Sequence, residues 1–146
     1  VNVSGGQLLV GSGVTIGVAG IATFRTGRID VSDSLRNTSI GQGTGDAHTT
    51  GSYNIGVGYN ALTANTTGQY NVSVGSNSLL ANTTGASNTA IGYAALNVNT
   101  TANNNVAVGH QSLLSNTTGT RNTAVGTNSL DANTTASNNT AVGLMH

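Results

Sequence analysis

Apolar, small and polar residues recur along most of this chain at a fixed interval of 17 residues. From residue 37 onward each unit begins with Asn, a Thr, Val or Ile, a small residue, a Val or Ile, and Gly, and five of the units later contain a Leu and an Asn-Thr-Thr run. Positions are numbered here from that first Asn. A fixed short period is the sequence signature of a repeat architecture, in which each unit stacks on the next. The glycines at position 5 keep the interval without a slip: Gly41, Gly58, Gly75, Gly92, Gly109, Gly126 and Gly143.

Two apolar positions in each repeat are expected to form the core. Position 4 is Val or Ile throughout, from Ile40 to Val142, and position 9 is Leu in five repeats. Position 3 is always Ala, Ser or Gly. Because successive residues of a strand point to opposite faces, we expect position 3 to face away from the core and to pack closely on another backbone, as in a subunit contact. The expected core leucines are Leu62, Leu79, Leu96, Leu113 and Leu130.

The polar positions predict ladders between stacked units. Asn recurs at position 1, from Asn37 to Asn139, and at position 12, from Asn65 to Asn133. Side-chain amides stacked at the strand spacing of about 4.8 Å hydrogen-bond to one another along the stack. The Gly at position 5 is expected to take a positive φ or to allow close backbone approach at a corner of the coil.

These features predict an all-β fold, a parallel β-solenoid with 17-residue coils. Units rich in Gly, Asn-Thr-Thr and β-branched residues make poor helices, which argues against a helical repeat. A coil of this length has room for about two short strands and two turns. One narrow coil holds few core residues, so we expect a homo-oligomer, most simply a three-fold one, to bury more apolar surface.

The chain divides into two segments by this criterion. Residues 1–36 do not follow the period and carry five of the eight formal charges, and we expect them to form an N-terminal β stalk or cap. Residues 37–146 hold about seven repeats. The last repeat breaks off partway, at Leu144, Met145 and His146, so we expect the solenoid to continue into further sequence.

Composition removes several classes of function. Only 5% of the 146 residues are charged, with four Arg against four Asp, so the chain lacks the basic surface that nucleic-acid binding requires. It has no Cys for disulfides or thiolate metal sites, and no apolar run near the roughly 20 residues that insertion into a membrane requires. With no Glu and few titratable groups, we expect neither an enzyme nor a bound cofactor.

The nearest approach to a reactive cluster is Asp46 and His48 with Ser39 or Ser52. The simpler interpretation is that His48 takes the place of Asn at position 12 in the first coil. The alternative is a metal or anion site on a three-fold axis, where three copies of this His would meet.

Recognition of a partner is expected at the positions where residue type varies. Position 6 carries Tyr59, Tyr93 and His110, whereas position 17 carries Tyr53, Tyr70 and Arg121. Tyrosine is a favoured contact residue because it presents a large rigid face with a polar tip. The alternative is that these side chains are scattered along the surface of a shaft.

The runs NTAIG (88–92) and NVAVG (105–109), followed by a small residue, Leu and an Asn/Gly turn, carry a resemblance. They resemble the N-S-V-A-I-G repeat of YadA-like heads of trimeric autotransporter adhesins, and the longer unit with Asn-Thr-Thr-Gly is similar to the version in tail fibres of tailed bacteriophages. The resemblance covers residues 37–146. It implies a left-handed parallel β-roll, a homotrimer, and a place in the virion. The partners that it implies are a host cell-surface glycan or protein receptor and other tail or fibre proteins.

Two alternatives use the same fold. A bacterial trimeric autotransporter adhesin head would place the protein on the bacterial outer surface. An ice-binding solenoid is prompted by the Thr-Thr pairs, from Thr66 and Thr67 to Thr134 and Thr135, although adjacent strand residues point to opposite faces and leave one Thr column per face.

Overall fold

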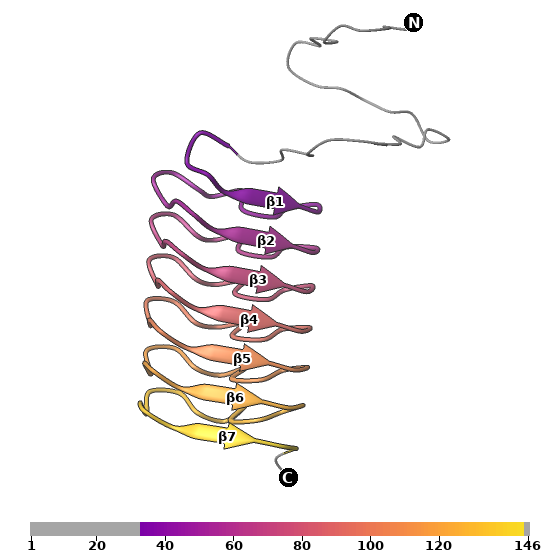
Figure 1. Cartoon of the computed structure of the whole chain (residues 1–146), viewed down its shortest axis with the longest axis vertical. Coiled ribbons are helices and arrows are strands. Elements are labelled where there is room, and N and C mark those ends of the chain that lie inside the picture. Colours follow the sequence, from indigo (N-terminus) through magenta and orange to yellow (C-terminus); the bar gives the residue numbers. More distant parts are fainter. Residues whose placement is uncertain (1–32, 145–146) are drawn as a thin grey trace, which may run out of the picture. The chain divides into compact units, whose positions relative to one another are not determined.

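The computed structural model describes residues 33–144, so the expected N-terminal stalk or cap lies outside the described residues except for residues 33–36. The described part contains seven strands of three residues each and is otherwise built of turns and extended segments (Figure 1). The strands are β1 (Thr38–Ile40), β2 (Ile55–Val57), β3 (Val72–Val74), β4 (Thr89–Ile91), β5 (Val106–Val108), β6 (Thr123–Val125) and β7 (Thr140–Val142).

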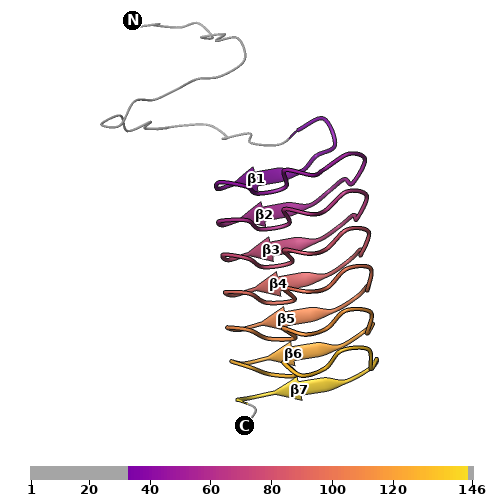
Figure 2. The ribbon, with the colours of Figure 1, turned by 180° about the vertical axis from the view of Figure 1, so that it is seen from behind.

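The strands stack in sequence order into one parallel sheet. Thr38 pairs with Ile55 and Ile55 pairs with Val72, so the register advances by one 17-residue repeat at every step. The same stack of coils is visible from the opposite side in Figure 2. The predicted parallel β-solenoid with about 17 residues per turn is therefore confirmed.

Each coil has one short strand, where we expected about two. The reason is the backbone conformation of positions 7, 9 and 17, which take positive φ even though most of them are not glycine; in the fourth coil these are Ala94 (52°), Leu96 (50°) and Asn104 (61°). Left-handed residues bend the chain and interrupt strand geometry. Neighbouring coils still bond through the backbone there, as when the Leu96 N–H donates to Ser112 O at 3.0 Å.

Position 5 provides the glycine corner that the sequence predicts. Gly92, for example, has φ 134°, a region open to glycine and closed to residues with a Cβ. A Cβ added there would lie 2.4 Å from the carbonyl oxygen of Gly109 in the next coil. The glycine is therefore required both by its own conformation and by the coil stacked on it.

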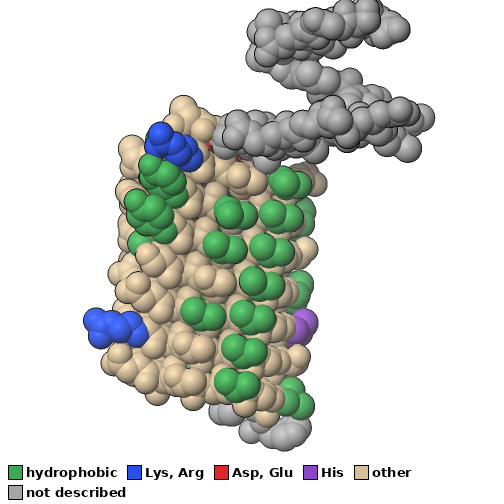
Figure 3. Space-filling model, viewed as in Figure 1, with side chains coloured by type: hydrophobic (Ala, Val, Ile, Leu, Met, Phe, Trp, Pro, Cys, Tyr) green, Lys and Arg blue, Asp and Glu red, His purple; other side chains and the backbone are tan. Residues whose placement is uncertain are grey.

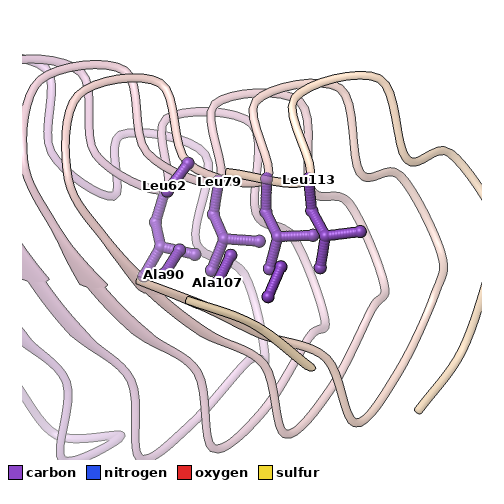
Figure 4. Close-up of a cluster of buried hydrophobic side chains, with 8 residues drawn as sticks. Leu62, Leu79, Ala90, Ala107 and Leu113 are labelled. Carbon is purple, nitrogen blue, oxygen red and sulfur yellow. The ribbon is translucent and has the colours of Figure 1, made fainter. Parts of the chain in front are cut away.

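The strands turn the opposite face to the core from the one that the sequence predicts. Position 9 faces inward as expected, and Leu62, Leu79, Leu96 and Leu113 are fully buried. The strand residues packed against them come from position 3, not position 4 (Figure 4). The prediction that position 4 is buried is wrong, and so is the expectation that position 3 forms an outer subunit contact. The buried position-3 residues are Gly56, Ser73, Ala90, Ala107 and Ala124, whereas Ile40, Ile91, Val125 and Val142 at position 4 are exposed.

The narrow interior explains the reversal. In the coils of β2 to β6 a leucine from the opposite wall fills the space in front of the strand, so only a small side chain fits at position 3. In the first coil the bulky residue at the opposite wall is Thr44. The next strand, β2, has Gly56 at position 3, where a Cβ would lie 2.6 Å from Thr44 Cγ2. Because strand residues alternate, an inward position 3 places positions 2 and 4 on the outer surface.

The predicted asparagine ladders are confirmed. At position 1, Asn71 Nδ2 donates to Asn54 Oδ1 at 3.1 Å, and the Asn71 N–H donates to the same oxygen at 2.9 Å. At position 12, Asn82 Nδ2 donates to Asn65 Oδ1 at 2.8 Å. These amides are fully buried, and burial of polar groups is tolerated because their bonding capacity is used. The ladders hold the coils in one register.

Replacing one ladder residue should therefore cost stability where replacing an exposed Asn does not. Asn88→Ser leaves the buried Asn105 N–H without Asn88 Oδ1, its acceptor at 3.0 Å, and should lower the free energy of unfolding by about 1–3 kcal/mol. The matched control is Asn104→Ser, since Ser87 already occupies position 17 in another repeat; it should change stability by less than about 0.5 kcal/mol. Urea unfolding followed by circular dichroism measures both. Equal losses would contradict the structural role of the ladder.

The glycine corner gives a second stability prediction. Gly92→Ala forces an alanine to φ 134° and against the Gly109 carbonyl, and should cost about 3 kcal/mol or more. A Cβ on Gly85 at position 15 would also lie close to the next coil, 2.5 Å from Ala102 O. Gly85→Ala should nevertheless cost clearly less, because Gly85 has no positive φ and the chain itself accepts Ala102 and Ala136 at that position. The same urea titration compares the two variants, and an equally mild effect of Gly92→Ala would show that the corner can relax.

Candidate recognition surface

The outer face of the sheet is apolar along its whole length. Positions 2 and 4 point outward from every strand, and exposed fractions of 49% for Ile40, 43% for Ile55 and 78% for Val142 show that no other described segment covers them. Figure 3 shows these side chains as two green columns, the first of which is interrupted where position 2 is Thr. Sequence analysis missed this face. The available signal was the uniform smallness of position 3, which marks the crowded side of the strand.

Two ridges flank this face. The N-side ridge consists of the residues two places before each strand: Arg36, Tyr53, Tyr70, Ser87, Asn104, Arg121 and Asn138. The C-side ridge consists of the residues two places after each strand: Gln42, Tyr59, Ser76, Tyr93, His110, Thr127 and Leu144. All six residues that sequence analysis selected for recognition lie on these ridges and are exposed.

On the N-side ridge the aromatic rings stack along the solenoid. The rings of Tyr53 and Tyr70 lie 5.2 Å apart between centroids with an interplanar angle of 11°. Arg36, which sequence analysis did not select, lies over the Tyr53 ring at 5.3 Å and donates from Nη1 to Tyr53 Oη at 2.6 Å. Arg121 lies further along the ridge, where its Nη1 donates to Asn138 Oδ1 at 3.5 Å. The ridge thus has an aromatic part and a separate cationic part.

On the C-side ridge Tyr93 and His110 stack, with centroids 5.2 Å apart and an interplanar angle of 21°. Tyr59 is separated from this pair by Ser76, which is one repeat further along than Tyr59. The structure therefore brings the six selected residues into two ridges and does not gather them into one cluster.

The sheet face and the two ridges form one surface, which we call the sheet side. The exposed large hydrophobic residues at positions 2, 4, 6 and 17 all belong to it, and Val98 is the one such residue in the described part that lies elsewhere. Contiguous exposed apolar surface of this kind marks interaction sites. The sheet side is suited to contact with another extended apolar or aromatic surface.

Within residues 33–144 the structure shows no pocket and no group of three or more His, Cys, Asp or Glu residues that could hold a metal ion. No helix in this part of the chain is long and apolar enough to cross a membrane.

The first coil differs from the others at its two wall positions. His48 occupies position 12, and its N–H donates to Gly45 O at 3.1 Å, just as the Asn65 N–H donates to Leu62 O. Gly45 replaces the usual Leu and leaves room for the imidazole, because a Cβ on Gly45 would lie 2.8 Å from the ring. The same added Cβ on Gly45 would lie 2.9 Å from Ser39 Oγ, so this hydroxyl also borders the space that the missing side chain leaves. Asp46 is exposed.

Asp33 ends the asparagine ladder at its N-terminal side. Asp33 Oδ1 accepts the Asn37 N–H at 2.9 Å, and Oδ2 accepts Asn37 Nδ2 at 3.1 Å, as the amide of a preceding Asn does elsewhere. Burial acts to raise the pKa of Asp33, but the hydrogen bonds from Asn37 and Leu35 outweigh it and hold the pKa below its usual range. Burial lowers the pKa of His48, and the charge of Asp33 opposes this.

No family model matches this chain, and neither a curated protein nor a solved structure was found that matches it. The class of protein is therefore defined by the residues and the fold: a parallel β-solenoid repeat protein with an apolar sheet face between two aromatic ridges.

The pKa of His48 leads to a pH prediction. Since its folded-state pKa lies below the unfolded value of about 6.5, its contribution to stability is full above that pH. The contribution is lost as the pH falls through 6.5 toward the folded pKa, because the unfolded state then binds more protons. His48→Asn, the residue of the other repeats, should remove this part of the pH dependence, and His110→Asn at the exposed ridge should retain it. Urea unfolding at several pH values between 7.5 and 5 measures the slope. An unchanged slope in His48→Asn would contradict the assignment.

Proposed function

We propose that this chain is a structural segment of a bacteriophage tail fibre, a homotrimeric β-roll of the YadA-like head type that supports attachment to the host cell surface. The observation that carries the proposal is the apolar sheet side, in which position 4 is Val or Ile on every strand from β1 to β7. The resemblance of the 17-residue motif to such heads and fibres supports the choice among solenoid proteins.

The dimensions of the sheet side support assembly with further copies. Six strand intervals of about 4.8 Å give a height of about 29 Å, and the six residue steps between the ridges give a width of about 20 Å. The product, about 600 Å², approaches the roughly 800 Å² that each partner buries in a standard interface. A closed ring of parallel copies places this surface around the ring axis and yields a straight rod.

The internal bonding supports a mechanical role. Every coil is joined to the next by strand pairing, by backbone bonds in the turns and by amides such as Asn99, whose Nδ2 donates to Asn82 Oδ1 at 2.9 Å. Because every pair of adjacent coils is connected by these hydrogen bonds, such a stack can transmit force along its length. The partners are then other copies of the chain, neighbouring tail or fibre proteins, and a host cell-surface glycan or protein receptor.

The alternative is a bacterial trimeric autotransporter adhesin head, which would use the same fold and the same sheet side. The two differ in gene context. Sequencing the full gene and its neighbours would find tail genes beside a fibre, and a signal peptide with a membrane-anchor domain in an adhesin. The second result would replace the virion location by the bacterial outer surface.

An ice-binding role is less well supported. The Thr hydroxyls at position 13 are used within the solenoid, as when Thr66 Oγ1 donates to Thr83 O at 3.0 Å. Position 14, from Thr50 to Thr135, is left as one exposed Thr column. A flat array of two Thr columns is therefore missing, and we expect no thermal hysteresis from the purified protein; measurable hysteresis would favour this role over a fibre.

Assembly gives the direct test of the proposal. The wild-type chain should have three times the 14.4 kDa monomer mass by light scattering after size exclusion. Ile91→Asp places a charge on the sheet side, where it would be buried in the trimer, and should give a monomer with an unchanged circular dichroism spectrum. Thr101→Asp, in the same coil at exposed position 14, should remain trimeric. A monomeric wild-type chain, or an Ile91→Asp trimer, would contradict assembly through this face.

A further inference from the structure

We propose that the two ridges meet across the seam between neighbouring copies, so that the N-side ridge of one copy packs on the C-side ridge of the next at the same height. This inference rests on the proposed homo-oligomer and adds to it a specific pairing of residues. It assigns the exposed tyrosines to a second copy of this chain as their partner.

The symmetry of a closed ring dictates which edges meet. Copies related by rotation about an axis parallel to the solenoid contact one another heterologously, so the edge before the strands in one copy faces the edge after the strands in the next. Rotation without translation leaves every strand at the same height as its symmetry mates. The residue two places before a strand therefore faces the residue two places after the same strand in the neighbour.

The side chains at these paired places have complementary sizes from β3 to β6. At β3 Tyr70 faces Ser76, whereas at β4 the sizes are reversed and Ser87 faces Tyr93. At β5 the order of β4 is kept, with Asn104 facing His110, and at β6 it reverses again, with Arg121 facing Thr127. Each large side chain thus has a smaller one opposite, as packing at an interface requires.

The first two strands show how this seam differs toward its N-terminal side. At β2 both residues are tyrosines, Tyr53 and Tyr59, so a large side chain has no smaller one opposite it there. At β1 Arg36 lies over the Tyr53 ring and faces Gln42, so both side chains there are long and polar at their ends. Size complementarity is therefore a property of β3 to β6, and the tests are placed there.

Contacts within one chain do not explain why the sizes of the paired ridge residues are complementary. Ser87 and Tyr93 are separated by an extended strand, and six residue steps at about 3.3 Å place them about 20 Å apart. Stacking within a ridge couples residues 17 apart, such as Tyr93 and His110, but not residues on opposite edges. Coupling between the two ridges must pass through another copy.

Ser87→Tyr tests the pairing with a variant that the fold already accepts. Tyr53 and Tyr70 occupy the same position with φ 59° and 58°, matching the 58° of Ser87. The variant places a tyrosine opposite Tyr93 of the next copy and should raise the dissociation constant of the assembly about tenfold or more, by overpacking. The double variant Ser87→Tyr with Tyr93→Ser exchanges the sizes and should restore it to within about threefold of wild type.

Sedimentation velocity over a concentration series, in urea at which the wild-type assembly is half dissociated, gives these constants. Thr101→Tyr adds the same bulk at an exposed site away from the ridges and should have no effect. The pair Ser76→Tyr with Tyr70→Ser repeats the test at β3, since Tyr59 and Tyr93 already occupy the position of Ser76.

The outcomes separate this inference from the proposed function. A wild-type chain that stays monomeric overturns the assembly itself. A wild-type oligomer that tolerates Ser87→Tyr, or whose loss is not restored by Tyr93→Ser, overturns the pairing alone and leaves the ridges free for a receptor. Restoration in the double variant, with Thr101→Tyr unaffected, supports it.

Discussion

The whole structure depends on the stacking of like on like at the strand spacing. Every residue lies above and below the equivalent residue of the adjacent coils, so each position must tolerate its own copy at about 4.8 Å. Amides satisfy this condition by donating and accepting along the column, as Asn54 and Asn71 do. Repeated charges would repel along every column. The low content of charged residues, 5% of the chain, is a consequence of the stack.

The same stack makes the interior narrow, and this decides where the apolar surface lies. The leucines at position 9 and the small residues at position 3 fill the space between two walls. The larger β-branched residues at positions 2 and 4 have no room inside and face outward, as Ile91 does at 40% exposure. A solenoid this thin cannot bury the larger residues at positions 2 and 4 of its own strands, and the apolar sheet side follows from that limit.

The sequence was sufficient to predict the features that recur in every repeat. It was not sufficient to predict which strand residues are buried. The amide ladders, the glycine corners and the inward leucines follow from residue type and period alone. The side of the strand that faces the core does not, because alternation distinguishes two faces without saying which is inner. The positive φ of Leu96 could not be predicted from residue type, since a leucine rarely adopts it and only the surrounding stack holds it there. The ridge positions were predicted from their variability, whereas the contact of Arg36 with Tyr53 required the structure.

The distribution of variability along the repeat has its own consequence for assembly. On the outer face of the sheet, position 4 is Val or Ile in every coil and position 2 is Thr, Val or Ile, so a neighbouring copy displaced by one coil would find much the same sheet face. A periodic surface cannot fix its own register, as is known for uniform strands. The ridges break the period, because Tyr70 and Ser87, or Ser76 and Tyr93, differ between adjacent coils. If the sheet face provides the area of the interface, the ridges are the part of the sheet side that can specify the height at which two copies meet.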